Sequence, residues 1–398
     1  MNGLMGSFPP RDGEQVTLAN WRTGPFTHWA FHHVREIVPT AEIANSPHNV
    51  WEFDDAFGDF SDLSIESGTD GPITLDTFLS RTDTDGFVVL HKGRCVFETY
   101  SNGMGRHDPH IVFSVSKSML GLLAGILVEK QIVDVEAPVT KYVPEMSATA
   151  YNGASVRDLL DMRAGVLFDE DYLATSGPIV DYRKATNWNP LEPGDKQDDL
   201  RGFYAQLTER DGQPGGAFHY TSPNTDLLGW VFERASGVRF SDLMSRHLWQ
   251  PMGAERSASI TVDRLGAPRT AGGISMIARD LARVGQLILQ GGRRDGVSII
   301  AESWIDDLYE NGDPDAWNAG DFAKDFPGLD MHYRSKWYVL RGDAPILFGL
   351  GIHGQNLFID RKNQVVIAKV ASRPAPLDTE LELLGLKAVR ALGDHLAG

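Results

Sequence analysis

Ser114 and Lys117 stand one helical turn apart, and an apolar run at helical spacing follows them from Met119 to Leu127. This pattern predicts a buried helix that begins around Ser114. Residues three apart share a helix face, so the amine of Lys117 can reach the hydroxyl of Ser114. Burial disfavours the charged form of a lysine, so a neutral amine becomes available to take the hydroxyl proton. The pair therefore indicates a nucleophilic serine with a lysine base.

The same pair has a purely structural interpretation. An SxxK pattern arises by chance on the order of once in a chain of ordinary composition. Ser114 could then be an N-cap, with Lys117 a solvated residue of the first turn. The apolar segment Ile111–Phe113 and the apolar run after Lys117 favour burial, and with it the chemical interpretation.

Tyr220 precedes a second predicted helix. Pro223 fits the first turn of this helix, Ser222 fits its N-cap, and Gly237 fits the residue just after its end. Capping explains Ser222 as well as a chemical role does. It does not explain Tyr220, whose phenol can pass a proton to a leaving group.

A third candidate segment runs from Gly351 to Asn356. Small residues in a strand let another backbone or a ligand approach closely, and such an edge can donate a peptide N–H to a developing oxyanion. Residues 349–354 also match GxGxxG, but strand-like sequence follows them rather than a helix, so we reject dinucleotide binding.

The sequence lacks the motifs of several other enzyme classes. HExxH, HxHxDH, CxxC and GxSxG patterns are absent from the sequence, which argues against zinc enzymes and α/β-hydrolases. His28 and His32 have helical spacing but no third ligand, so we interpret them as ordinary helix-face residues. Cys95 is the single cysteine and is expected to be a buried thiol. We expect no metal and no cofactor.

The elements that must position these residues fall into three parts. Residues 1–70 are aromatic-rich and aperiodic, and we expect an irregular wrapping segment. Residues 71–130 and 267–398 carry strand patterns, among them 86–90, 95–100, 346–352, 356–360 and 365–372, with a final helix at 379–396. Residues 131–266 look mostly helical. The expected fold class is α/β, with a sheet from the two ends of the chain and an inserted α-rich region.

Composition excludes several partners. The 398 residues include 37 Lys and Arg against 54 Asp and Glu, a net charge of −17. Nucleic acid and anionic membrane surfaces are bound mainly through Lys and Arg, so neither is an expected partner. The sequence has no apolar run long enough for a membrane span or a signal segment, and we expect a cytoplasmic protein.

In this order and at these separations, the three segments resemble the signature of serine β-lactamases and penicillin-binding proteins. Finer similarity points to the 6-aminohexanoate-dimer hydrolases, class C-like proteins with carboxylesterase activity. The runs that carry it are 113–118, 170–172, 220–226, 278–285 and 351–356. The resemblance implies a β-lactamase-like fold, an antiparallel sheet flanked by helices, and it suggests a homodimer.

The resemblance also implies roles for single residues. Ser114 is the expected nucleophile, Lys117 its base and Tyr220 the second proton-transfer group, with the peptide N–H groups of Ser114 and Ile352 as the oxyanion hole. Tyr172 is expected to cover one end of the substrate. The remaining expected substrate-binding residues are Trp188, Trp337, His353, Ser222 and Asn224. Large aromatic residues often belong to a core, which is the alternative for the two tryptophans.

Two departures limit the resemblance. Ala271 stands where the nylon-dimer branch has Asn, and the segment 181–183 also differs, so amide-dimer hydrolysis is in doubt. Gly351-Ile352-His353 replaces a KTG-like triplet, and without its lysine β-lactam turnover is less favoured.

We therefore expect a serine hydrolase for a small ester or amide substrate, with ester hydrolysis favoured because alcohols leave more readily than amines. The alternatives are a β-lactamase or D-amino-acid peptidase, and a non-catalytic binding or scaffold protein on the same fold. The acidity of the chain raises the further hypothesis that the substrate carries a cationic amine.

Overall fold

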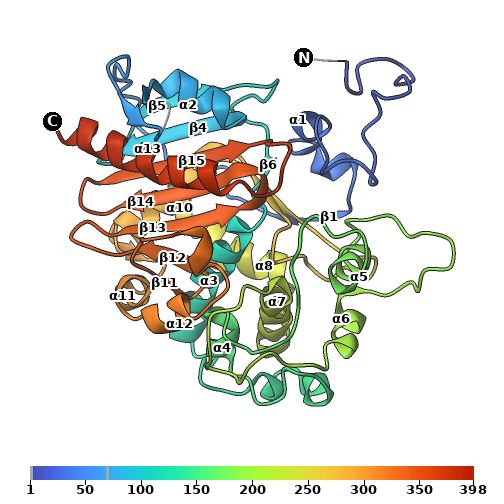
Figure 1. The fold of residues 1–398 in the computed structure, drawn as a ribbon. Helices are drawn as coiled ribbons and strands as arrows, with labels where there is room; N and C mark the ends of the chain where they lie inside the picture. The colour runs from blue at the N-terminus through green and yellow to red at the C-terminus, as the bar shows by residue number, and fades with distance from the viewer. Residues whose placement is uncertain (1–2, 69–70) are drawn as a thin grey trace.

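A seven-stranded antiparallel sheet joins the two ends of the chain (Figure 1). The computed structural model describes residues 3–68 and 71–398. In spatial order the strands are β11 (Met331–Arg334), β12 (Trp337–Leu340), β13 (Ile346–Gly351), β14 (Gln355–Asp360), β15 (Val365–Ala371), β4 (Thr84–His91) and β5 (Arg94–Tyr100). The hairpin and the three C-terminal strands predicted from the sequence all belong to this sheet.

Helices cover both faces of the sheet because its central strands are apolar on both sides. Successive side chains of a strand point to opposite faces. In β14, Leu357 lies beside α10 (Ala278–Leu289), where Gly285 allows close approach, and Phe358 lies beside α13 (Thr379–Ala397). The chain thus forms the layered arrangement expected, an antiparallel sheet flanked by helices.

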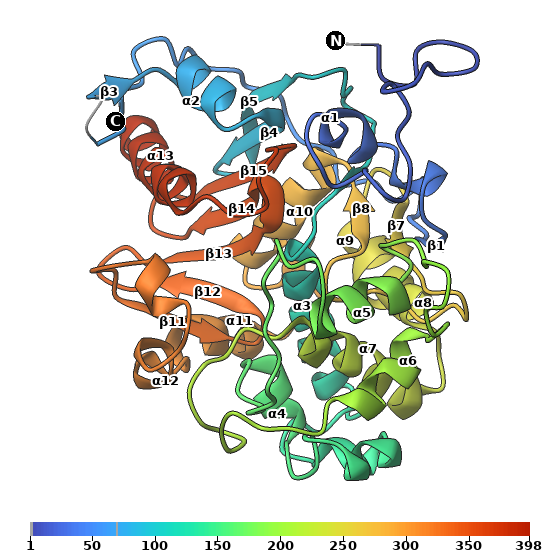
Figure 2. The same ribbon diagram turned by 45° about the vertical axis from the view of Figure 1, so that its right-hand side comes forward.

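The middle of the chain is largely helical and lies beside α3 (Val115–Glu129), which packs between it and the sheet (Figure 2). Its helices are α4 (Val156–Leu160), α5 (Pro178–Ala185), α6 (Leu200–Phe203), α7 (Ser222–Ser236), α8 (Phe240–Met244) and α9 (Gln250–Met252). Two further helices, α11 (Glu302–Glu310) and α12 (Pro314–Asn318), pack near β11.

A second, four-stranded sheet combines strands from all three parts of the chain that the sequence analysis distinguished. Its order is β1 (Thr40–Ile43), β7 (Ala258–Thr261), β8 (Ile274–Met276) and β6 (His110–Ile111). β1 belongs to the segment predicted as irregular, and β7 to the range predicted as helical. Both are four residues long, too short for a clear alternating pattern. The boundary expected at residue 70 lies outside the described residues.

The remaining described elements are short. They include α1 (Thr27–Ala30), α2 (Leu75–Arg81) and two small hairpins, β2 (Ile65–Glu66) with β3 (Pro72–Ile73) and β9 (Arg293–Arg294) with β10 (Val297–Ser298). Within residues 3–68 and 71–398, none of the helices combines the length and the apolar character that crossing a membrane requires.

Candidate active site

Ser114 lies at the junction between the small sheet and α3. β6 ends at Ile111, and the chain then turns at Phe113, whose φ of 41° is in the left-handed region. Non-glycine residues seldom adopt this conformation, and such strain tends to occur at functional sites. Ser114 follows as the N-cap residue of α3, but its side chain makes no capping hydrogen bond. The hydroxyl instead accepts a hydrogen bond of 2.8 Å from Nζ of Lys117.

Lys117 is 1% exposed, which contradicts the interpretation of this residue as a solvated first-turn lysine. Burial lowers the pKa of its amine from 10.5 to about 7, and the positive charge of Arg269 acts in the same direction. Glu170 and Asp226 oppose this shift without cancelling it. A substantial share of neutral amine is therefore present near pH 7, as a base for Ser114 requires.

A buried carboxylate holds the second partner of Lys117 in place. Nζ of Lys117 also donates to the carbonyl of Ala271 at 2.7 Å. The N–H of Ala271 donates to Asp226 at 2.7 Å, and Asp226 also pairs with the guanidinium of Arg269. Ala271, noted above as a departure from the resemblance, thus contacts Lys117 through its backbone carbonyl.

Tyr220 lies just before α7 and faces the same group. The lysine Nζ is 4.8 Å from the centre of the phenol ring, which stacks on Phe322. Burial raises the pKa of the Tyr220 phenol above its usual value of 10, with Glu170 acting in the same direction and the hydroxyl of Ser114 opposing it. The phenol therefore stays protonated at neutral pH and can donate a proton.

The end of β13 forms the edge beside Ser114. A Cβ atom on Gly351 would lie 2.6 Å from the carbonyl oxygen of Val112 and 3.1 Å from the nitrogen of Ser114, so only glycine fits here. In the described part of the chain, the N–H groups of Ser114 and Ile352 donate to no protein acceptor. Two unpartnered peptide donors near a nucleophile are the arrangement that an oxyanion hole needs.

A cavity of about 100 Å³ opens at Ser114, and we call it the Ser114 cavity. Most of its wall is aromatic or aliphatic. Its lining residues are Ser114, Tyr172, Tyr220, Phe322, Asp325, Phe326, Tyr338, Leu350, Gly351, Ile352, Leu377, Asp378, Thr379 and Glu382. Of the predicted residues, Ser114, Tyr220, Tyr172 and Ile352 meet here.

Glu170 connects two predicted residues and was not itself predicted. Its carboxylate accepts hydrogen bonds from the hydroxyl of Tyr172 at 2.9 Å, from the N–H of Ser222 at 2.6 Å and from the hydroxyl of Ser222. The capping account of Ser222 is therefore wrong, because Thr221 is the N-cap and the hydroxyl of Ser222 donates to Glu170. The acidic run 169–171 offers no sign of which carboxylate turns inward.

The other predicted binding residues lie elsewhere. Trp188 packs against Trp21 and Phe113, and Trp337 is fully buried in the main core. Neither tryptophan lines the Ser114 cavity, which favours the core alternative for both. Asn224 accepts a hydrogen bond of 2.9 Å from buried Tyr151.

His353 faces away from Ser114. Its Nδ1 bonds to the carbonyl of Arg373 at 2.7 Å, and burial lowers the pKa of the imidazole to about 4. It lines a separate cavity on the other side of Ile352.

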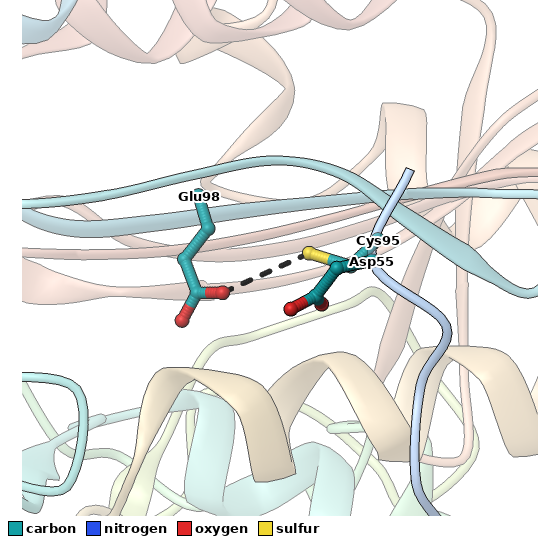
Figure 3. Close-up of side chains that lie close together, drawn as sticks. All are labelled: Asp55, Cys95 and Glu98. Atoms are coloured by element: carbon teal, nitrogen blue, oxygen red, sulfur yellow. Dashed lines mark hydrogen bonds between the residues drawn. The ribbon is translucent and has the colours of Figure 1, made fainter. Parts of the chain in front are cut away.

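One group of potential metal ligands lies away from this site. Figure 3 shows Asp55, Cys95 and Glu98, with a hydrogen bond of 3.8 Å between the thiol and Glu98. The guanidinium of Arg279 already pairs with both carboxylates. Burial raises the pKa of the Cys95 thiol to about 12, which disfavours the thiolate that a metal needs. We interpret the group as an ion-pair cluster.

Comparison with known proteins agrees with this geometry. The family model described as Beta-lactamase matches residues 77–391. The chain belongs to the β-lactamase family. It is a serine hydrolase of this family.

Two relatives place it more closely. The 6-aminohexanoate-dimer hydrolase of Paenarthrobacter ureafaciens is 34% identical over 370 residues, covering 93% of this chain and 91% of that protein. A solved structure from Bacillus anthracis, assigned as a 6-aminohexanoate-dimer hydrolase, is 26% identical with a TM-score of 0.88 and covers 96% of this chain and 97% of that one.

EstCE1, a hydrolase with promiscuous acyltransferase activity, shares the β-lactamase fold at 17% identity. Its TM-score is 0.62, over 79% of this chain and 98% of that chain. At this identity, the match supports the fold alone.

Proposed function

We propose that this protein hydrolyses carboxylic esters and short linear amides through an acyl-enzyme on Ser114. The observation that carries the proposal is the 2.8 Å hydrogen bond between the Ser114 hydroxyl and a buried Lys117 amine with a pKa of about 7. The relatives named for 6-aminohexanoate-dimer hydrolysis support linear amides as part of the substrate range.

In the proposed reaction, Lys117 takes the proton of Ser114 as the hydroxyl oxygen attacks the substrate carbonyl. The peptide N–H groups of Ser114 and Ile352 stabilise the negative charge on the carbonyl oxygen. The phenol of Tyr220 then protonates the departing alcohol or amine. Lys117 and Tyr220 next activate a water molecule that releases the acid, and this sequence requires no cofactor.

The Ser114 cavity gives little support to the alternative of a β-lactamase. None of the residues that line it is a lysine or an arginine, so within this cavity the carboxylate of a penicillin-type substrate meets no cation. The alternative of a non-catalytic scaffold is weakened by the contact between Ser114 and Lys117.

A substrate panel tests the proposal. We expect turnover of p-nitrophenyl acetate and butyrate, slower turnover of the linear 6-aminohexanoate dimer, and negligible turnover of nitrocefin. Ready hydrolysis of nitrocefin with poor ester hydrolysis would favour the β-lactamase alternative. Inertness toward all three, together with no labelling by a fluorophosphonate, would favour a scaffold.

The pH dependence of ester hydrolysis should follow the protonation of Lys117. Because Lys117 must be neutral to accept a proton, kcat/KM for an ester should fall below pH 7, about tenfold per pH unit, and level off above it. The raised pKa of Tyr220 keeps its phenol protonated, so the plateau should extend well into the alkaline range. Initial rates between pH 5 and 9 at low substrate concentration measure this profile. A profile that rises only toward the ordinary lysine pKa would contradict it.

A variant of Glu170 separates this electrostatic account from a general loss of structure. The negative charge of Glu170 raises the pKa of Lys117, so Glu170→Gln should move the acid limb of the profile to lower pH. Glu36 is exposed and belongs to the N-terminal segment, and Glu36→Gln is the matched control, which should leave the limb in place. A Glu170→Gln profile that only falls in height would mean that Glu170 acts through packing alone.

Two further sequence-based expectations join the proposal. These are a homodimer and a cytoplasmic location. Light scattering of the purified protein and fractionation of the source cells test them.

A further inference from the structure

A second cavity adjoins the Ser114 cavity. Tyr172 and Ile352 line both, so the two spaces share a wall at the proposed oxyanion hole. The second cavity measures about 250 Å³, and we call it the arginine cavity because two arginines line it. Its lining residues are Leu18, Ala19, Trp21, Arg22, Thr23, Tyr172, Leu173, Arg183, Ile352, His353, Pro374 and Pro376.

Arg22 enters this cavity with unused donors. Its Nη2 donates to the carbonyl of Trp188 and to the side chain of Asn189. Its Nε–H is buried and has no acceptor within the described residues. Nη1 donates to no acceptor within the described residues and is not enclosed as Nε is, so it is the donor that an external acceptor can reach.

Arg183 also lacks a carboxylate partner. It is 7% exposed and donates to two backbone carbonyls, those of Asp171 and Ala174, at 3.2 Å each. Within the described residues, neither Arg22 nor Arg183 forms a salt bridge, whereas nearby Arg269 pairs with Asp226. In a chain with a net charge of −17, a half-buried and a buried arginine side by side without carboxylate partners are unexpected.

The charges around the two guanidinium groups leave a positive field. Burial, Arg183 and Arg269 lower the pKa of Arg22 to about 9, and no carboxylate counters this shift. Burial and Arg269 lower the pKa of Arg183 as well, although Glu170, Tyr172 and Asp171 oppose that change. His353 is neutral at pH 7 because burial lowers its pKa to about 4. The cations are thus held at an energetic cost that an anion would relieve.

We propose that the arginine cavity binds a carboxylate of the substrate through Arg22 and Arg183, so that the preferred substrates are esters and amides with an anionic end. Arginine presents a planar fork of donors that matches a carboxylate. This inference rests on the proposed function, and it concerns a carboxylate of the substrate, separately from the hypothesis that the acidity of the chain selects a cationic amine. The two arginines line the far side of Ile352, whereas the charged residues that line the Ser114 cavity itself, Asp325, Asp378 and Glu382, are acidic.

Matched pairs of esters test the proposal. One pair places the carboxylate on the acyl group, mono-p-nitrophenyl adipate against p-nitrophenyl hexanoate. The other places it on the leaving group, 4-acetoxybenzoate against its methyl ester. We expect the anionic member of at least one pair to have a kcat/KM at least tenfold higher. Arg22→Gln and Arg183→Gln should each remove most of this preference, and Arg22→Lys and Arg183→Lys should restore part of it.

Arg35→Gln is the control for charge removal. Arg35 is exposed, belongs to the same N-terminal segment as Arg22 and lines neither cavity, so its loss should leave the preference intact. A preference that is absent in both pairs, or that survives both glutamine variants, would overturn the inference.

A binding measurement separates this inference from the proposed reaction. Adipate should raise the melting temperature of the Ser114→Ala protein, whereas 1,6-hexanediol should not, and the shift should vanish when Arg22→Gln or Arg183→Gln is added. This result would support the anion site even if no ester were hydrolysed. The absence of any shift with millimolar adipate would count against it.

Discussion

Ser114→Ala should lower kcat for p-nitrophenyl butyrate by roughly a thousandfold or more. The substitution removes the oxygen that attacks the carbonyl and leaves Lys117 with no proton to accept. The residual rate should come from the oxyanion donors and substrate positioning alone, as in other enzymes that lose their nucleophile. Steady-state kinetics measures the loss of rate. Intact-protein mass spectrometry after treatment with a fluorophosphonate measures the loss of covalent labelling.

Ser118→Ala is the matched control for this variant. Ser118 lies one turn further along α3, and its hydroxyl donates to the carbonyl of Lys336 at 2.9 Å rather than to Lys117. The control should keep the covalent label on Ser114. Labelling of the Ser114→Ala protein at the same rate, or an unchanged kcat, would show that another residue is the nucleophile.

The contact between Ser114 and Lys117 could be predicted because it is local. One helical turn fixes the spacing, and the apolar residues on either side of the pair predict its burial. The hairpin and the three C-terminal strands of the large sheet were predictable for a similar reason, since strongly apolar runs such as 365–372 leave few alternatives. The two strands β11 and β12, each four residues long, were not predicted. The short strands β1 and β7 carry too few residues to show a period.

Contacts between distant segments were not predictable from pattern alone. Glu170 and Ser222 are 52 residues apart, and a serine before a proline at a helix start has the same sequence whether it caps the helix or bonds to a remote carboxylate. Asp226 gave a weak signal, a charged residue just before an apolar stretch of α7, but its partner Arg269 lies 43 residues away.

The tryptophans show a different limit. A large aromatic residue is suited both to a binding cleft and to a core. Trp188 and Trp337 belong to the core, whereas the cleft wall uses residues such as Phe322 and Tyr338. Arg22 was overlooked because it lies in an aperiodic segment, and its proximity to Arg183 depends on how that segment folds against α5.

Tyr220→Phe should affect substrates according to their leaving groups. Alkoxides and amide ions are poor leaving groups, so hydrolysis of an alkyl ester or a linear amide should fall by about 10²–10⁴ when the proton donor is lost. p-Nitrophenolate departs without protonation, so acylation by a p-nitrophenyl ester should slow far less. Water activation still requires the phenol, so the variant should release about one equivalent of p-nitrophenolate in a burst and then turn over slowly.

Tyr309→Phe is the control, because the buried hydroxyl of Tyr309 has no hydrogen-bond partner in the described part of the chain and Tyr309 does not line the Ser114 cavity. Stopped-flow absorbance for the p-nitrophenyl ester, compared with product analysis for ethyl butyrate, measures the two effects. An equal loss for both substrates, with no burst, would mean that Tyr220 shapes the cavity rather than donating a proton. A larger loss for ethyl butyrate, together with a burst, would identify the phenol as the proton donor, because only a donor distinguishes substrates by the basicity of the group that departs.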